Sequence, residues 1–315
     1  MGNYVFGVDV GGTSVKMGLF NMEGMAVDKW EIPTRTEGNG EHILPDIAES
    51  IHKKIAEKQY GKEEIAGIGI AVPGPVNGAG VVNKAVNLGW NVTPVKEIME
   101  KLSGISTEVG NDANVAALGE MWKGGGQGHT SLVMVTLGTG IGGGVIVDGR
   151  LVTGADGAGG EIGHMHIMDD EEEACNCGCK GCLEQYGSAT GIVRLAKKVL
   201  AETDEPSVLR DTEITAKAVF DAVKEGDKAA REAAERFGEI LGKGLAVIAS
   251  VLNPAAFVIG GGVSKAGEIL FDFIRPPFEK YVFPGSRDAK FVLATLGNDA
   301  GIYGAAKLVL DAEQE

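Results

Sequence analysis

The central segment of this chain carries cysteines and histidines at the spacing of a metal site. All the cysteines of the 315-residue sequence fall within eight residues, just after two histidines: His164, His166, Cys175, Cys177, Cys179 and Cys182. Disulfides inside so short a segment would close small, strained rings, and nothing around the one Cys-x-x-Cys, Cys179–Cys182, is typical of a thioredoxin-like redox site. Thiolates and imidazoles are the usual ligands of tetrahedral structural zinc. The cluster therefore predicts zinc, with six candidate ligands for four positions.

Two glycine-rich turns have the composition of phosphate-binding loops. Gly11-Gly12-Thr13 and Gly138-Thr139-Gly140 each follow a short apolar run, and glycines there leave backbone N–H groups open to an anion. The GTGIGG of residues 138–143 also fits a dinucleotide pattern, but the strand-like Val145-Ile146-Val147 follows where that pattern requires a helix. Either turn alone is more simply a tight hairpin. Together, with Asp9 to hold Mg²⁺ and Lys16 to neutralise charge, they favour a polyphosphate ligand.

A carboxylate at the start of an expected helix is the candidate catalytic base. Asn111-Asp112 lies between a short apolar run and the helical pattern of residues 113–122. Asp112 in a cleft beside a terminal phosphate would accept the proton of an attacking hydroxyl. Asp is also a very common helix N-cap, and on spacing alone the cap is the better interpretation.

Composition and charge exclude several classes of partner. The formal net charge is −15, the pI is about 4.9, and the lysines and arginines are scattered, so a nucleic-acid partner is not expected. The N-terminus does not have the pattern of a signal peptide. The longest apolar stretch, residues 244–262, is interrupted by Asn253-Pro254, so no membrane span is expected. These features predict a cytoplasmic protein without a membrane partner.

The elements that must position these groups alternate between strands and helices, which indicates an α/β protein, and the length favours two domains. Strands are expected at residues 3–9, 15–20, 25–32, 65–72, 105–109, 132–137, 144–147, 255–259 and 291–296, and helices at 41–59, 113–122, 188–201, 215–224, 227–252 and 300–310. Residues 132–147 repeat the strand, glycine turn and strand of residues 3–20, which indicates two related halves. The acidic run Asp169–Glu173 is expected to be a solvated loop.

Three glycine-rich segments of the sequence resemble motifs of actin-like sugar kinases. DVGGTSVK, LGTGIGGG and GGGVS (residues 260–264) are similar to their phosphate 1, phosphate 2 and adenosine motifs, and His164 with CNCGCKGCLE is similar to the signature of the ROK (repressor, open reading frame, kinase) family. The resemblance implies a two-lobe actin-like ATPase (ribonuclease H-like) fold with a cleft for nucleotide and sugar. It implies a small lobe of residues 1–117 completed by helix 300–315, and a large lobe of residues 118–299 with the zinc site and an oligomer interface.

The same resemblance assigns roles to individual residues. The zinc ligands would be His164, Cys175, Cys177 and Cys182, which leaves Cys179 as a spare thiol. The sugar would be bound by Glu161, His164 and Glu184 around C1 and C2, and by Asn111, Asp112 and Gly144 elsewhere, with Asp112 as the base. Nucleotide and magnesium would be bound by Asp9, Gly11, Gly12, Thr13, Lys16, Gly138, Thr139, Gly140, Gly261 and Gly262.

The resemblance implies an ATP-dependent glucokinase acting as a homodimer or tetramer. The alternatives are a kinase for fructose, mannose or N-acetylmannosamine, and a polyphosphate-using glucokinase. A sugar-sensing repressor of the same family would carry an N-terminal helix-turn-helix, for which a first strand starting at residue 3 leaves no room. We therefore expect an enzyme.

Overall fold

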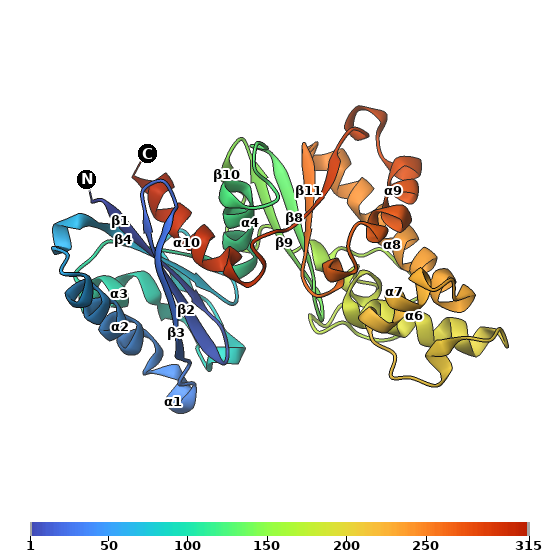
Figure 1. Ribbon diagram of the computed structural model, residues 1–315, viewed down its shortest axis with the longest axis horizontal. Helices are drawn as coiled ribbons and strands as arrows, with labels where there is room; N and C mark the ends of the chain where they lie inside the picture. The colour runs from blue at the N-terminus through green and yellow to red at the C-terminus, as the bar shows by residue number, and fades with distance from the viewer. Residues whose placement is uncertain (1, 314–315) are drawn as a thin grey trace. The chain divides into compact units, whose positions relative to one another are not determined.

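The computed structural model describes residues 2–313 and divides into two compact units (Figure 1). The first unit comprises the residues up to Gly128, then Gly144–Gly160, then those from Thr295 on; the second comprises His129–Gly143 and Glu161–Ala294. The expected lobe boundary at residue 117 falls inside helix α4 (Asp112–Lys123), which packs along helix α10 (Ala300–Ala312). The whole of α4 therefore belongs to the first unit.

A five-stranded sheet with the order β3-β2-β1-β4-β7 forms the centre of the first unit. The strands β1 (Tyr4–Val10), β2 (Ser14–Asn21) and β3 (Ala26–Pro33) are antiparallel, whereas β4 (Ile65–Val72) and β7 (Thr107–Asn111) run parallel to β1. The carboxyl ends of parallel strands meet at one edge of a sheet. Here the register places Asp9 opposite Ala71, and Val72 opposite Asn111, so Asp9 and Asn111 lie at the same edge.

Helices cover both faces of this sheet, because its strands alternate their apolar side chains. The helices α2 (Ile43–Lys58) and α3 (Val95–Ser103) lie on one face and α10 lies on the other (Figure 1). Phe6 of β1 packs in a buried cluster with Ile51 of α2, whereas Val5 packs with Ile302 of α10. The helix α10 lies so close to β4 that a Cβ on Gly69 would meet a backbone carbonyl at 1.7 Å. The remaining short elements are α1 (Glu37–Gly40), β5 (Val81–Val82) and β6 (Thr93–Pro94).

The second five-stranded sheet repeats the strand order of the first, as β10-β9-β8-β11-β12. A glycine turn joins β8 to β9, and β11 is parallel to β8 and to β12. The strand β10 and the end of β9 belong to the first unit. The long α8 packs against α6, α7 and α9. The bounds are β8 (Leu132–Leu137), β9 (Ile141–Val147), β10 (Arg150–Leu151), α5 (Glu184–Gly187), α6 (Ala189–Glu202), α7 (Ala216–Lys224), α8 (Lys228–Leu252), β11 (Ala256–Gly260), α9 (Ile269–Tyr281) and β12 (Lys290–Leu293).

Most of the expected helices and strands are confirmed, and three differences stand out. Strand β9 begins at Ile141 rather than at Gly144, because its glycines continue the extended backbone. Helix α3 was not expected. Neither was α9, which contains Pro276-Pro277; its Phe278 packs on Phe257 and Phe291 of the sheet, with ring centroids 5.8 and 5.0 Å apart. Among residues 2–313, no helix has both the length and the apolar content that a membrane crossing requires.

Candidate functional site

In the first unit, Asp9 lies at the end of β1, beside the glycine turn. Its cross-strand partner is Lys16, whose Nζ donates a hydrogen bond to the carbonyl oxygen of Asn298 at 3.1 Å. The turn between them is exposed at Gly12 and Thr13. Burial and the nearby Asp112 carboxylate raise the pKa of Asp9 to about 6, against the lowering effect of Lys16. A divalent cation at this carboxylate would offset both causes, so the site fits Mg²⁺.

The start of α4 shows which of Asn111 and Asp112 is the helix cap, whereas the catalytic role of Asp112 stays a prediction. The N-cap is Asn111, whose side chain accepts a hydrogen bond from the backbone N–H of Asn114 at 3.1 Å. Its amide nitrogen also donates to the carbonyl oxygen of Gly74 at 3.1 Å. The interpretation of Asp112 as the cap is therefore wrong by one residue. Asp112 is the first helical residue, it is exposed, and one of its carboxylate oxygens accepts from the backbone N–H of Ala113 at 2.8 Å.

In the second unit, four of the six candidate zinc ligands come together. One ligand atom from each of His164, Cys175, Cys177 and Cys182 lies within 4.8 Å of the others. The sulfurs of Cys177 and Cys182 are 3.6 Å apart, and zinc–sulfur bonds of about 2.3 Å in a tetrahedral site would place two sulfurs about 3.8 Å apart. Chain reversal brings these residues into contact, since His166 bridges to Cys182 and Ala174 to Lys180 in antiparallel register.

The other two candidates do not join this group. The ring of His166 is held elsewhere, with Nδ1 2.9 Å from the carbonyl oxygen of Lys180 and Nε2 3.0 Å from a carboxylate oxygen of Asp169. Cys179 is exposed and lies outside the four. Burial and a hydrogen bond to Glu184 raise the pKa of the Cys175 thiol to about 12. Three cysteine sulfurs and one imidazole nitrogen are the ligands that structural zinc prefers, so the donor set fits a bound Zn²⁺.

The predicted sugar-binding carboxylates flank the metal group. Glu184 is half-buried, and its Oε1 accepts from the Cys175 thiol at 2.8 Å and lies 3.8 Å from Nδ1 of His164. Its Oε2 accepts from the backbone N–H of Ile141 at 3.2 Å. Glu161 is exposed, with a carboxylate oxygen 3.9 Å from Nε2 of His164. The two nitrogens of the His164 ring therefore face different groups, Nδ1 towards Cys175 and Nε2 towards Glu161.

The start of α6 forms hydrogen bonds with the turn between β8 and β9. The carbonyl oxygen of Gly138 accepts from the backbone N–H of Ala189 at 2.8 Å, and that of Thr139 accepts from the Thr190 hydroxyl at 2.7 Å. A Cβ on Gly140 would lie 2.2 Å from Oε2 of Glu184. This turn and Glu184 are therefore in direct contact.

The remaining predicted ligand residues are glycines in two different settings. Gly261, with φ of +83°, and Gly262 are exposed just after β11, where a Cβ on Gly261 would meet the carbonyl oxygen of Leu137 at 2.5 Å. Gly144 is instead buried, and a Cβ there would lie 2.5 Å from Cβ of Ala117 in α4. Its glycine identity is explained by this close packing, and its substrate role stays a prediction.

The acidic run Asp169–Glu173 is not wholly solvated, which corrects the expectation from sequence. Glu171 is buried and forms a bidentate ion pair with Arg194 of α6, and the Tyr186 hydroxyl of α5 donates to the same carboxylate. Sequence reasoning missed these three residues because nothing in the run of five acidic residues distinguishes the third.

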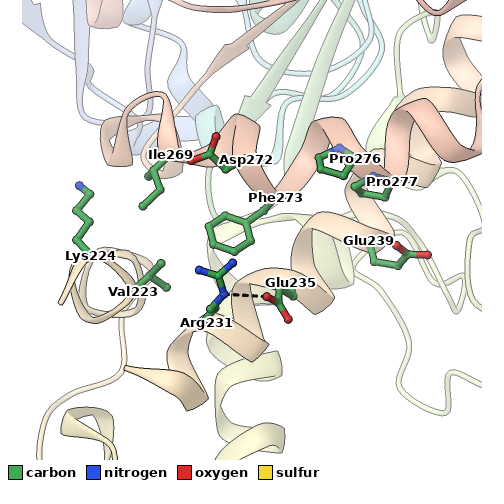
Figure 2. Close-up of a pocket in the computed structure, with 10 residues that line it drawn as sticks. All are labelled: Val223, Lys224, Arg231, Glu235, Glu239, Ile269, Asp272, Phe273, Pro276 and Pro277. Atoms are coloured by element: carbon green, nitrogen blue, oxygen red, sulfur yellow. Dashed lines mark hydrogen bonds and ion pairs between the residues drawn. The ribbon is translucent and has the colours of Figure 1, made fainter. Parts of the chain in front are cut away.

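A groove of about 770 Å³ lies elsewhere in the second unit, between α7, α8 and α9 (Figure 2). Arg231 pairs with Glu235 at 3.0 Å, and Glu239 accepts from the Tyr281 hydroxyl at 2.6 Å. None of the predicted site residues lines this groove. The lining residues are Val223, Lys224, Arg231, Glu235, Glu239, Ile269, Asp272, Phe273, Pro276 and Pro277.

Comparison with known proteins gives a consistent result over the whole chain. Residues 5–312 match the family model described as ROK family. A glucokinase from Halalkalibacterium halodurans is 43% identical over 98% of this chain and 95% of that protein, and a glucokinase from Thermotoga maritima is 37% identical over 97% of this chain and 96% of that protein. The crystal structure of a ROK family glucokinase from Streptomyces griseus in complex with glucose and AMPPNP matches with a TM-score of 0.73 at 34% identity, covering 97% of this chain and 98% of that chain. The actin-like ATPase fold expected from the sequence is confirmed.

Proposed function

Because this chain belongs to the ROK family over nearly its whole length, we propose that it is an ATP-dependent glucokinase. It transfers the γ-phosphoryl group of Mg·ATP to the 6-hydroxyl of glucose. Glucokinases at 43 and 37% identity that match it end to end support this function, as does the matching glucokinase structure with glucose and AMPPNP.

One observation carries the assignment of the site. Glu184 has one carboxylate oxygen beside the metal group, 2.8 Å from the sulfur of Cys175, and its other oxygen accepts from the backbone N–H of Ile141 at the glycine turn. A sugar-binding carboxylate, a structural metal and a phosphate-binding turn are thus connected through a single side chain. This arrangement supports a site where a hydroxyl compound and a phosphate meet, as phosphoryl transfer requires.

The carboxylates and His164 supply sugar recognition in the second unit. A carboxylate accepts two hydrogen bonds and therefore suits the vicinal hydroxyls of a sugar. Glu161 and Glu184 bind the hydroxyls around C1 and C2. His164 would ligate the metal through Nδ1, which would leave Nε2, on the Glu161 side, for a hydroxyl.

The first unit supplies the base. Asp112 accepts the proton of the 6-hydroxyl while the oxygen of that hydroxyl bonds to the γ-phosphorus of ATP. The bond between the γ-phosphorus and the β–γ bridging oxygen breaks, and ADP leaves. Asn111 caps α4 and holds the neighbouring residue in place. Asp9 would hold Mg²⁺ directly or through water, the turns at Gly12 and Gly138–Gly140 bind phosphates, and Gly261-Gly262 adjoin the adenosine.

Metal ions supply two kinds of chemistry when bound: Zn²⁺ fixes the loop that carries its ligands, and Mg²⁺ neutralises phosphate charge. His164, Cys175, Cys177 and Cys182 would hold the zinc. With that loop fixed, Glu184 is already held at the turn, so ordering its side chain adds no further free-energy cost when the substrate binds.

Steady-state kinetics with a panel of hexoses tests the proposal. The panel is glucose, mannose, fructose, N-acetylmannosamine and N-acetylglucosamine, each with ATP or with polyphosphate. We expect the highest kcat/KM for glucose with ATP. A higher value for another hexose or for polyphosphate would retain the kinase and overturn its specificity, and no turnover with any pair would overturn the kinase.

A further inference from the structure

Glu171 is a buried carboxylate that the proposed chemistry does not use. It lies in the loop between His166 and the zinc ligand Cys175, and its side chain is only 3% exposed. Its two oxygens accept from both terminal nitrogens of Arg194, from the Tyr186 hydroxyl and from the backbone N–H of Glu173. We call Glu171, Tyr186 and Arg194 the Glu171 cluster.

The cluster joins three separate pieces of the second unit. Glu171 belongs to residues 164–182, which carry the four predicted zinc ligands and which we call the metal loop. Tyr186 belongs to α5 and Arg194 to α6, and the Arg194 guanidinium also lies over the Tyr186 ring, 5.3 Å from its centroid. The ion pair with Arg194 lowers the pKa of Glu171 to about 2, so the carboxylate is charged at neutral pH. Charge-assisted bidentate pairs of this kind fix geometry as well as distance.

A second tie runs parallel to the cluster, through Gln185. Its side-chain oxygen accepts from the backbone N–H of Cys182 at 3.0 Å, and its amide nitrogen donates to the carbonyl oxygen of Glu173 at 3.0 Å. The residues on either side of Gln185 are Glu184 and Tyr186. The metal loop is therefore bound to α5 at Gln185 and at Tyr186, the two residues that follow Glu184.

The helices α5 and α6 also hold the glycine turn between β8 and β9. Glu184 contacts the N–H of Ile141, while Ala189 and Thr190 at the start of α6 bond to the carbonyl oxygens of Gly138 and Thr139. The orientation of Glu184 thus depends on how α5 sits between the metal loop and α6. The ion pair fixes these two pieces to each other.

We propose that the Glu171–Arg194 ion pair, with Tyr186, is a positioning device for sugar recognition, which holds α5 so that Glu184 faces the substrate. The inference rests on the proposed role of Glu184 in binding the sugar. Arg194 and Glu171 are positioning residues and do not contact the substrate themselves.

The device predicts a particular kinetic signature. Without the ion pair, α5 samples several positions, and only a fraction of molecules present Glu184 correctly. The apparent sugar affinity falls in proportion to that fraction, and saturating sugar selects the competent molecules. A competent fraction of about one tenth raises the glucose KM roughly tenfold and leaves kcat within about twofold. A residue that only stabilises the fold would instead lower the amount of active enzyme and leave the KM unchanged.

Arg194→Gln and Glu171→Gln test this, with Arg236→Gln as the matched control. Arg236 also lies on a helix of the second unit, has a similarly exposed side chain and pairs with Glu202 and Glu232, neither of which belongs to the metal loop or to α5. For the zinc-loaded enzyme, we expect a roughly tenfold rise in glucose KM for both test variants, an unchanged KM for ATP, and wild-type kinetics for the control. Zinc content measured by atomic emission should stay at one ion per chain.

Two further variants keep every outcome informative. Tyr186→Phe removes only the hydroxyl from the Glu171 cluster and should raise the glucose KM about 2–5-fold even where Arg194→Gln fails to fold. Glu184→Gln tests the proposed function separately. If Glu184→Gln raises the glucose KM while the Arg194, Glu171 and Tyr186 variants keep the wild-type value, the positioning proposal is overturned alone. If Glu184→Gln leaves the KM unchanged, the role of Glu184 in sugar binding fails first, and the positioning proposal fails with it.

Discussion

A methyl group added at Gly140 should weaken glucose binding by displacing Glu184. The Cβ of an alanine there would lie 2.2 Å from Oε2 of Glu184, where ordinary contacts begin at 3.4 Å, so the carboxylate must move by about 1 Å (3.4 − 2.2). The displaced atom is the end of a flexible side chain and Gly140 does not have a positive φ, so the fold should accept the change. The carboxylate loses its bond from the N–H of Ile141 and its position towards the sugar.

The size of the effect follows from the hydrogen bond to glucose that the displaced Glu184 carboxylate no longer makes. A hydrogen bond to a charged group contributes about 1.5–3 kcal/mol, which corresponds to roughly a 10–150-fold weaker affinity for glucose. Isothermal titration calorimetry with glucose in the absence of nucleotide measures this directly, without a contribution from phosphate binding at the same turn. The melting temperature, recorded alongside, reports whether the fold is intact.

Gly138→Ala is the matched control. It adds the same methyl group to the same turn, but its nearest neighbour would be the carbonyl oxygen of Gly140 at 4.0 Å. Its glucose affinity should equal that of the wild type. An unchanged affinity in Gly140→Ala, or an equal loss in both variants, would refute the placement of Glu184 as a sugar ligand held against this turn.

Asp112→Asn should lower kcat by roughly 10²–10⁴-fold, the span typical of losing a general base, with a much smaller change in the calorimetric glucose affinity; full turnover would exclude Asp112 as the base. Cys175→Ser should lose its zinc and raise the glucose KM, whereas Cys179→Ser should keep one zinc per chain, and metal analysis showing the reverse would indicate a different ligand set. Asp9→Asn should stabilise the magnesium-free protein at pH 7. Because the native pKa of Asp9, about 6, exceeds its ordinary value of 3.8, its stability contribution is fully present below pH 3.8 and is lost as the pH rises through 6. Urea unfolding at pH 7 should show a gain of about 1–3 kcal/mol that disappears near pH 4, and a gain independent of pH would contradict this cause.

Local patterns were sufficient to predict most of the fold. The four-residue spacing of Ile43, Ile47, Ile51 and Ile55 predicts α2, and all four are buried. The repeated strand, glycine turn and strand predicts two related halves, and the two sheets have the same strand order. Helix α9 was missed because the intrinsic preference of Pro276-Pro277 argues against a helix. Packing of Phe278 on the sheet, which depends on distant residues, decides the outcome.

The site shows the same division between local and distant information. Spacing identified the six metal candidates, the family resemblance named four, and the structure brings those four together. Spacing could not separate Asn111 from Asp112 as the cap, because adjacent polar residues fit the pattern equally. Glu171 was beyond sequence reasoning because its burial depends on Arg194, 23 residues further along the chain.

Phosphorus NMR of the reaction products tests the central claim most directly. The enzyme, with zinc bound, is incubated with glucose, ATP and Mg²⁺, and the phosphate ester is identified by its coupling to the sugar protons. The proposed function predicts glucose 6-phosphate and ADP in equal amounts. Phosphate released without an ester, an ester at another hydroxyl, or no consumption of ATP in the presence of glucose would contradict it.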